Sequence, residues 1–445
     1  MKILSRRFLR TLIVPLFLLL LPPTAQPQDH ETVAARFLRY VRVNTQSRED
    51  ADSIPSSAGQ WTLAHLLEKE LHRLGVTDVT IDDHCYLYAS LPPTLPDSAA
   101  AHVPAIALVA HLDTSPETSG DSVVPLVHKN YQGGPIVLPG DTAVALLPDR
   151  IPHLREYVGS DIITARGTTL LGADDKAGIA EIMTAVQELL ADHHRPHGAV
   201  KIAFTPDEEV TGAVKFDLRR CGALYAYTID GEQTGEISNE TWNADEAVIT
   251  FRGKNTHPGS AKGIMVNSLY VLADFIARLP EEMKPETTDR RTGFLHPYTG
   301  TLDVGMSKVK CLLRSFDLSG LEKQKNILFD IRKQTLERFP SAVIDIDIRP
   351  DYRNMRLKLD KVPFVTSYAA EACREAGVQP DITPTRGGTD GAILTEKGLP
   401  CPNIFTGAEN IHSVHEWIPV RGMEAAVQTI INLVHLWTEK SLPPK

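Results

Sequence analysis

The sequence predicts an α/β protein in which a layered domain is interrupted by a smaller α+β domain of ferredoxin-like type. Short apolar runs typical of buried strands alternate with segments of helical periodicity, as in a layered sheet. Polar clusters follow these runs directly, where ligands gather in such sheets. In the middle of the chain, residues 343–349 (VIDIDIR) alternate apolar and acidic side chains, which is typical of a strand with one exposed face.

The layered domain is predicted from two helices and four strands. Leucines at helical spacing predict a helix over residues 61–74, and Gly75 is a suitable residue to end it. Residues 175–194 place apolar side chains on one face, so we expect an amphipathic helix there. The expected buried strands are residues 103–110, 200–204, 225–229 and 401–405.

The middle of the chain predicts a separate β-α-β-α-β unit inserted in the layered domain. Its expected elements are strands at 247–253 and 343–349, helices at 266–279 and 321–339, and a polar loop at 280–293. We place the inserted domain at residues 244–355. The layered domain then consists of residues 28–243 and 356–445.

Composition limits the possible partners and bonds. The 445 residues carry a net charge of −10, which argues against a nucleic-acid partner. The five cysteines are scattered and form no CxxC pair, so the sequence indicates neither a disulfide framework nor a thiolate zinc site. We expect them to be small buried side chains: Cys85, Cys221, Cys311, Cys373 and Cys401.

Residues 1–27 have the order of regions that is typical of a secretory signal peptide. Four basic residues precede the apolar run 12–21, and small residues near Ala25 follow it. The run is too short to span a bilayer comfortably, so no stable membrane insertion is expected. We expect an exported protein, periplasmic or secreted, that begins between Gln26 and His30. The alternative is an uncleaved anchor.

Polar clusters recur after the expected strands and at the start of a helix. They are HLDTS (111–115), GADDKAG (172–178), TPDEE (205–209), DGE (230–232) and NIHSVHEW (410–417). Each alone has an ordinary explanation; acids at a helix start, for example, favour the macrodipole. Together they indicate one site rich in oxygen and nitrogen donors, without thiolate. That donor set suits zinc, or less specifically manganese or cobalt.

Longer motifs resemble a known family from about Thr32 to Trp437. They are HLDTSPETSG, TLLGADDKAGIAEIMTA, AFTPDEEVTGAVKFD, HPGSAKGIMVN, RGGTDGA and GLPCPNIFTG. In this order they resemble the peptidase T family of tripeptide aminopeptidases, within the larger family of co-catalytic dizinc aminopeptidases, carboxypeptidases and deacylases. The resemblance implies a zinc-peptidase-type α/β domain with an inserted lid or dimerisation domain, and hence a possible homodimer. It also implies a hydrolase that releases the N-terminal residue of tripeptides by metal-activated water.

The resemblance implies that five residues hold two zinc ions. His111 and Asp230 would bind the first ion, Glu209 and His412 the second, and Asp174 would bridge both. His415 lies close to His412 in the same motif. His412 is preferred because the family's ligand His precedes a Glu by four residues, as His412 precedes Glu416.

Other residues receive catalytic roles from the same resemblance. Glu208 would be the general base, and Asp113 would orient the imidazole of His111. Asp207, which precedes Glu208, is expected to have a structural role.

Five residues are substrate-binding candidates. His257 would stabilise the oxyanion, in its own subunit or in its partner. Arg386 and Arg314 would grip the C-terminal carboxylate, because a guanidinium binds a carboxylate in two places. Asn267 is a weaker candidate for a peptide contact, as is Asn354.

Two acidic residues depart from the family's pattern. Glu232 adds a charge near the expected metal or amine pocket, and Glu409 adds another in the last motif. The charge of Glu232 would favour the N-terminal ammonium of a substrate or alter specificity, and the sequence assigns no effect to Glu409. The alternatives to a tripeptide aminopeptidase are a dipeptidase, a carboxypeptidase or an N-acyl amino-acid deacylase of the same dizinc family, and an inactive peptide-binding protein.

Overall fold

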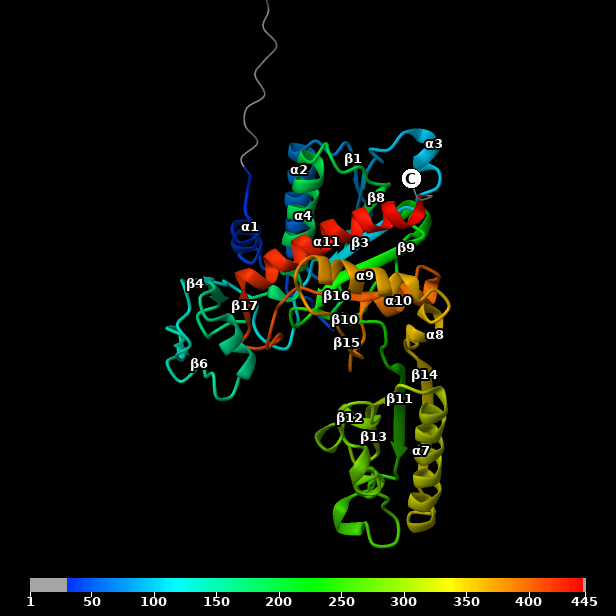
Figure 1. Cartoon of the computed structure of the whole chain (residues 1–445). Helices are drawn as coiled ribbons and strands as arrows, with labels where there is room; N and C mark the ends of the chain where they lie inside the picture. The colour runs from blue at the N-terminus through cyan, green and yellow to red at the C-terminus, as the bar shows by residue number, and fades with distance from the viewer. Residues whose placement is uncertain (1–29, 443–445) are drawn as a thin grey trace, which may run out of the picture. The chain divides into compact units, whose positions relative to one another are not determined.

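An eight-stranded mixed sheet organises the larger part of the chain in the computed structural model, which describes residues 30–442 (Figure 1). The proposed signal peptide, residues 1–27, lies outside the described residues. The strands, in sheet order, are β1 (Asp78–Ile81), β2 (Leu87–Leu91), β8 (Val200–Thr205), β3 (Ile106–His111), β9 (Tyr225–Gly231), β16 (Asn403–Phe405), β10 (Glu236–Ser238) and β15 (Asp381–Ile382). The four central strands, β8, β3, β9 and β16, are parallel. Each overlaps one of the predicted apolar runs, although β3 begins three residues and β16 two residues later than predicted.

Helices cover both faces of this sheet. One face packs against α1 (Val33–Tyr40), α2 (Ala58–Leu74), α4 (Ala173–Ala191), α9 (Phe364–Glu375) and α11 (Val420–Ser441). The other face packs against α5 (Leu218–Cys221) and α10 (Asp390–Lys397), and α8 (Arg356–Leu359) contacts α10. A short helix, α3 (Asp97–Ala100), precedes β3. This layered arrangement confirms the predicted α/β fold class.

Helix α4 differs from the amphipathic helix predicted over residues 175–194. Of its residues only Ala191 is exposed, because the helix lies against β3 and β9 and is covered by α1, α2 and α11. A helix between a sheet and a helical layer has no face left for water. The prediction was right for the apolar face and wrong for the opposite one.

The second sheet belongs to the inserted segment and has four antiparallel strands. Its order is β12 (Phe294–Thr301), β13 (Met306–Ser315), β11 (Asn243–Arg252) and β14 (Val343–Pro350), with α6 (Ser268–Ala277) and α7 (Leu318–Arg338) packed against it. Its separate apolar core includes Phe251, Phe275 and Leu313. The chain order β-α-β-β-α-β is ferredoxin-like.

The predicted β-α-β-α-β order was therefore wrong, because the two strands β12 and β13 were not recognised. Strand β12 is an edge strand with four exposed residues at its end, a proline at position 297 and a register shift after it, so it lacks a regular alternation. Strand β13 does alternate, with Ser307, Val309, Cys311 and Leu313 buried. Serines at the buried positions 307 and 315, and Leu312 on the opposite face, obscured that period in the sequence.

The segment between β3 and α4 supplies most of two small sheets. In the first, β7 (Ile162–Thr164) pairs with β4 (Leu126–His128) and with β17 (Trp417–Pro419), which comes from the C-terminal part of the chain. In the second, β5 (Ile136–Val137) pairs with β6 (Ala145–Leu146). Short 3₁₀ helices occur at Pro152–Tyr157, Pro258–Ser260, Glu281–Met283 and Pro285–Thr287. All five cysteines are buried and unpaired, as predicted.

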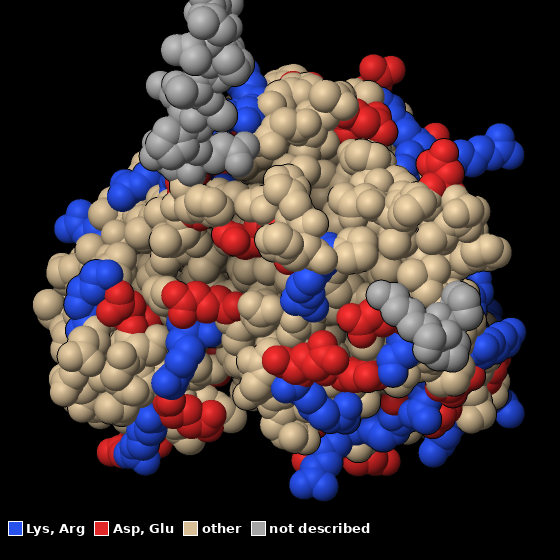
Figure 2. Space-filling model, turned by 45° about the horizontal axis from the view of Figure 1, so that its top comes forward, with Lys and Arg blue, Asp and Glu red and all other residues tan. Residues whose placement is uncertain are grey.

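Within residues 30–442, no helix is long and apolar enough to cross a membrane. Figure 2 shows one face of the molecule, on which acidic and basic side chains are interspersed.

Candidate metal centre and active site

The predicted ligands meet at one edge of the eight-stranded sheet. His111 is the last residue of β3, Asp230 lies near the end of β9, and Glu209 follows β8. His412 lies in the loop after β16, and Asp174 is at the start of α4. These strands are parallel, so their carboxyl ends share an edge and bring together residues that are far apart in the sequence.

Asp174 stands between the two imidazoles. Its Oδ1 lies 2.8 Å from Nε2 of His111, and its Oδ2 lies 3.0 Å from Nε2 of His412. Oδ1 of Asp230 is 3.5 Å from Nε2 of His111, and Oε1 of Glu209 is 3.0 Å from Nε2 of His412. The arrangement has two halves joined by one carboxylate, which is the geometry that a bridging ligand requires.

The electrostatics of the cluster fit bound cations. Burial raises the pKa of Asp230 to about 7 and that of Glu209 to about 8, and the charge of Asp174 adds to both shifts. Burial also opposes the charge of Asp174, but hydrogen bonds from His111 and His412 outweigh it and lower that pKa. Oε1 of Glu209 is buried and receives no hydrogen bond, because its contact with His412 lacks hydrogen-bond geometry. Buried carboxylates in this state suit metal coordination.

A second carboxylate lies behind each imidazole. Oδ1 of Asp113 is 3.4 Å from Nδ1 of His111, and Oε2 of Glu117 is 3.1 Å from Nδ1 of His412. Carboxylates at this position commonly fix the tautomer and ring orientation of a metal-binding histidine. The sequence singled out Asp113 but not Glu117, which is 295 residues from His412 and carries no local signal.

Glu208 is held from two sides. Asp113 accepts the backbone N–H groups of Glu208 and Glu209 at 2.9 and 3.2 Å. One carboxylate oxygen of Glu208 accepts the backbone N–H of Asp390 at 3.1 Å, at the N-terminus of α10. Burial, followed by the charge of Asp230, raises the pKa of Glu208 well above its usual value. A carboxyl group with a raised pKa beside a ligand cluster is suited to proton transfer.

Asp207 has the structural environment that was expected of it. Its carboxylate accepts the backbone N–H of Ser56 at 2.7 Å and the side-chain amide of Gln60 at 2.7 Å. Its φ of 56° turns the chain sharply after β8. The turn places Glu208 and Glu209 on the ligand side.

A cavity of about 310 Å³ opens on the cluster, lined among others by Asp174, Glu208 and Arg386. The guanidinium of Arg386 donates to the backbone oxygens of Arg290 and Thr292 at 2.7 and 3.2 Å, and lies over the ring of Trp242. It therefore connects the layered domain with the inserted one at the edge of the cavity.

The other substrate-binding candidates lie in the inserted domain, engaged in local contacts. His257 accepts the backbone N–H of Gly259, and Asn267 accepts that of Leu269. Arg314 donates to the backbone oxygens of Asp245 and Leu313, and Asn354 is buried in hydrogen bonds to Glu240 and Phe316. None of the four is among the residues that line the 310 Å³ cavity. Their substrate roles stay predictions.

Two acids near the cluster were not assigned roles from the sequence. Asp175 accepts the backbone N–H of His111 at 3.0 Å, which ties the end of β3 to α4. Glu416 is buried and accepts four backbone N–H groups at 2.6–3.1 Å: those of Leu171, Gly172, Ala173 and Asp174. The spacing of Glu416 from His412 was noticed in the sequence, but its partners lie more than 240 residues away.

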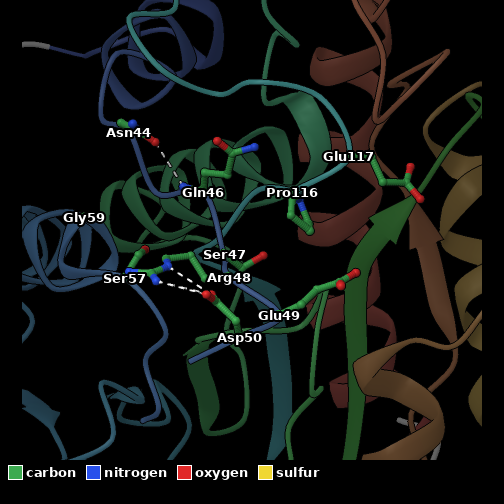
Figure 3. Close-up of a pocket in the computed structure, with 10 residues that line it drawn as sticks. All are labelled: Asn44, Gln46, Ser47, Arg48, Glu49, Asp50, Ser57, Gly59, Pro116 and Glu117. Atoms are coloured by element: carbon green, nitrogen blue, oxygen red, sulfur yellow. Dashed lines mark hydrogen bonds and ion pairs between the residues drawn. The ribbon is translucent and has the colours of Figure 1, made fainter. Parts of the chain in front are cut away.

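A second hollow of about 750 Å³ lies beside this site (Figure 3). It is lined by Asn44, Gln46, Ser47, Arg48, Glu49, Asp50, Ser57, Gly59, Pro116 and Glu117. Glu117 belongs both to this hollow and to the surroundings of His412, whereas Arg48 pairs with Asp50 at 3.2 Å. The hollow borders the metal cluster but holds none of its ligands.

The fold and the cluster together define a metal-dependent hydrolase with an inserted ferredoxin-like domain. The model of peptidase family M20/M25/M40 matches residues 145–436, more than half of the chain. The chain belongs to this peptidase family.

Close sequence relatives cover almost the whole chain. Peptidase T of a Geobacillus species is 44% identical over 410 residues, which are 92% of this chain and 99% of the relative. Peptidase T of Vibrio cholerae is 44% identical over 404 residues, 91% of this chain and 97% of the relative.

Solved structures share the fold. The aminopeptidase PepT of Bacillus cereus superposes with a TM-score of 0.69 at 22% identity, covering 92% of this chain and 99% of that one. A tripeptidase of Staphylococcus aureus superposes with a TM-score of 0.71 at 19% identity, covering 92% and 98%.

Proposed function

We propose that this chain is a metal-dependent aminopeptidase that releases the N-terminal residue of tripeptides. The observation that carries the proposal is Asp174, whose two carboxylate oxygens face two imidazoles in a cavity that Glu208 also lines. The near full-length relatives named peptidase T support the substrate class.

Two metal ions are proposed, held by His111, Asp174, Glu209, Asp230 and His412. Zinc suits two imidazoles with three carboxylates, and manganese or cobalt would be substitutes. When bound, the ions supply a nucleophile from water at neutral pH and stabilise negative charge on the carbonyl oxygen of the substrate. A solved structure with the same fold, from Bacillus subtilis, is described as a dinuclear metal-binding peptidase.

The remaining roles fall to the chain's own side chains. Glu208 takes a proton from the attacking water and returns it to the leaving amine. Asp113 holds the Glu208–Glu209 backbone and faces His111, so it sets the position of base and ligand together. Arg386, at the edge of the cavity, is the proposed partner of the substrate's C-terminal carboxylate.

The test is hydrolysis of Ala-Ala-Ala beside Ala-Ala, Ala-Ala-Ala-Ala and N-acetyl-alanine, with metal content measured on the same sample. We expect tripeptide hydrolysis, loss of activity by about a hundredfold or more in Glu208→Ala, and unchanged metal content in that variant. Equal rates on dipeptides or acylated amino acids would instead favour the dipeptidase or deacylase alternative. Bound metal without turnover of any of these would favour a binding protein.

A homodimer through the inserted domain is also proposed. Nine of the large hydrophobic side chains that are exposed belong to this domain: Ile264, Tyr270, Ile276, Tyr298, Leu302, Met306, Leu318, Phe329 and Val343. Exposed apolar side chains concentrated in one domain are candidates for an interface. Light scattering during size exclusion measures the mass, and a monomer at micromolar concentration would contradict the proposal.

Export is proposed from the N-terminal sequence pattern alone. A basic segment, a short apolar run and small residues occur in the order of a signal peptide. N-terminal sequencing of the protein from cell fractions would test the proposal. A start between Gln26 and His30 in the exported fraction supports it, and an intact start in the cytoplasm contradicts it.

A further inference from the structure

A cavity of about 510 Å³ continues the catalytic cavity on one side. The two cavities share four lining residues: Glu232, Glu236, Thr385 and Arg386. Because these residues belong to both cavities, a peptide held at the ligand cluster can extend a side chain from one cavity into the other.

Carboxylates dominate the lining of this 510 Å³ cavity. Glu232, Glu236 and Glu409 line it together with Asp381 and Glu156. The charge of Glu232 acts on both Glu236 and Glu409, so the three are close enough to repel one another. Within the described part of the chain, no ion pair includes any of these three glutamates.

Glu409 is the residue of this group that most needs a partner. Its side chain lines the cavity although only 6% of the residue is exposed, and its buried Oε1 receives no hydrogen bond. Burial, followed by the charges of Glu232 and other acids, raises the pKa of Glu409 to about 8. Buried carboxylates are ordinarily paired or hydrogen-bonded, so the environment of Glu409 is incomplete within the chain itself.

The basic residues that line the cavity contact groups other than Glu232, Glu236 and Glu409. Arg386 donates to backbone oxygens of the inserted domain, and Nδ1 of His153 lies 3.3 Å from Glu156. Neither forms an ion pair with Glu232, Glu236 or Glu409. The raised pKa of Glu409 means that a proton balances this group when the cavity is empty, and a cationic ligand would take the place of that proton.

We propose that this cavity is a subsite for a cationic side chain of the substrate, so that the enzyme prefers tripeptides that contain lysine or arginine. The inference rests on the proposed peptidase function. A lysine or arginine side chain has a long apolar stem and a terminal cation, which suits a cavity with carboxylates at its wall. A glutamate-containing tripeptide is expected to be a poor substrate, because its carboxylate would be repelled.

The test compares kcat/KM for Ala-Ala-Ala with tripeptides that carry lysine, methionine or glutamate at each position in turn. Methionine controls for the length and apolarity of the side chain. We expect lysine to exceed methionine by about tenfold or more at one position, the size of a charge-assisted hydrogen bond. The lysine-to-methionine ratio should fall by a similar factor in Glu409→Gln and in Glu232→Gln, and stay unchanged in Glu337→Gln, an exposed residue of α7.

A second measurement separates this proposal from the proposed activity. Calorimetry records binding of the lysine and methionine tripeptides to metal-loaded Glu208→Ala, which requires no turnover. Tighter binding of the lysine peptide supports the subsite even if no tripeptide is hydrolysed. Equal affinities, or a preference for lysine that survives both Glu409→Gln and Glu232→Gln, would overturn the subsite proposal. Hydrolysis of Ala-Ala-Ala would still support the proposed peptidase activity in that case.

Discussion

Acidic side chains around the metal cluster have distinct tasks, which follow from the backbone groups that they hold. Asp113 accepts the N–H groups of Glu208 and Glu209, and Asp175 accepts that of His111. Glu416 accepts four N–H groups in the segment that ends at Asp174. These acids restrain the backbone that carries the ligands, which keeps a metal site preorganised.

Removal of the Glu416 carboxylate should weaken metal binding. Glu416→Ala leaves four buried N–H groups without their acceptor, so Asp174 is no longer held in place. We expect metal affinity to fall about 10- to 100-fold, with a smaller loss in Glu416→Gln, which keeps one acceptor oxygen. Competition with a chelator measures the affinity, and Glu424→Gln on the exposed side of α11 is the control. Unchanged affinity in a folded Glu416→Ala would contradict a positioning role.

Away from the metal cluster, the acidic residue Glu70 stabilises the packing of the N-terminal helices. Glu70 of α2 accepts the guanidinium of Arg36 at 2.7 Å, that of Arg39 at 2.7 Å and the hydroxyl of Tyr40 at 2.9 Å. Burial alone would raise the pKa of Glu70, but the two arginines outweigh it and lower the value. The carboxylate therefore favours the folded state at neutral pH.

The contribution of Glu70 should depend on pH in a defined direction. A folded-state pKa below the unfolded value gives stability that is fully present above the unfolded pKa and is lost as the pH falls through the folded pKa. At pH 7, Glu70→Ala should reduce the free energy of unfolding by about 3–5 kcal/mol, as expected when a buried ion pair loses one partner. Urea unfolding of both proteins at pH 7 and pH 3 is the measurement. A difference that does not shrink at pH 3 would contradict this account.

At the scale of elements, α4 determines how closely the ligand-bearing segments approach. Gly178 allows α4 to lie against β9, because a Cβ there would be 1.9 Å from the backbone oxygen of Ile229 and 2.4 Å from Oδ1 of Asp175. The same helix begins beside Asp174, and β9 carries Asp230. The spacing between α4 and β9 therefore also sets the spacing between the proposed ligands Asp174 and Asp230.

Gly178→Ala should destabilise the protein and loosen the metal site together. The added methyl group has no room, so the helix must move away from β9 at a cost of about 1–3 kcal/mol. Gly134→Ala is the matched control, because nothing lies within 4 Å of a Cβ at that position. Thermal unfolding and metal titration of both variants are the measurements. A Gly178→Ala protein as stable as Gly134→Ala would show that the helix tolerates the shift.

For the whole molecule, the metal ligands and the inserted domain are separate. All five proposed ligands lie outside residues 243–350, and the inserted domain has its own apolar core. Metal binding should therefore stabilise the eight-stranded sheet directly and the four-stranded sheet hardly at all.

Removal of metal should unfold the two parts unequally. A ligand in thousandfold excess over its Kd stabilises the state that binds it by about 4 kcal/mol, so a chelator should lower Tm and abolish peptidase activity, and zinc should restore both. Hydrogen exchange should increase at the ends of β3, β8 and β9 but not in β11, β13 or β14. Equal loss of protection in both sheets would contradict the expected unequal stabilisation, and activity that resists the chelator would contradict a metal-dependent enzyme.

Much of the architecture could be predicted from local patterns. The runs that became β3, β8, β9 and β16 are continuous and apolar, and Gly75 ends α2 in a left-handed conformation, as its position suggested. Long motifs were enough to indicate the family and the metal ligands. Strand β12 was missed because half of it is exposed, and α4 was called amphipathic because periodicity does not reveal what covers a helix.

The sequence by itself determined the fold class, the buried strands, the free cysteines and the donors available to a metal, since these depend on residue type and on spacing along the chain. Only the tertiary structure decided which atoms meet. It placed Glu117 behind His412, gave Glu416 its four N–H partners and left Glu409 buried beside a cavity without a hydrogen bond to Oε1. The physical reason is that hydrogen bonding, burial and repulsion depend on distances in space, and strand order brings together residues that the chain separates by hundreds of positions.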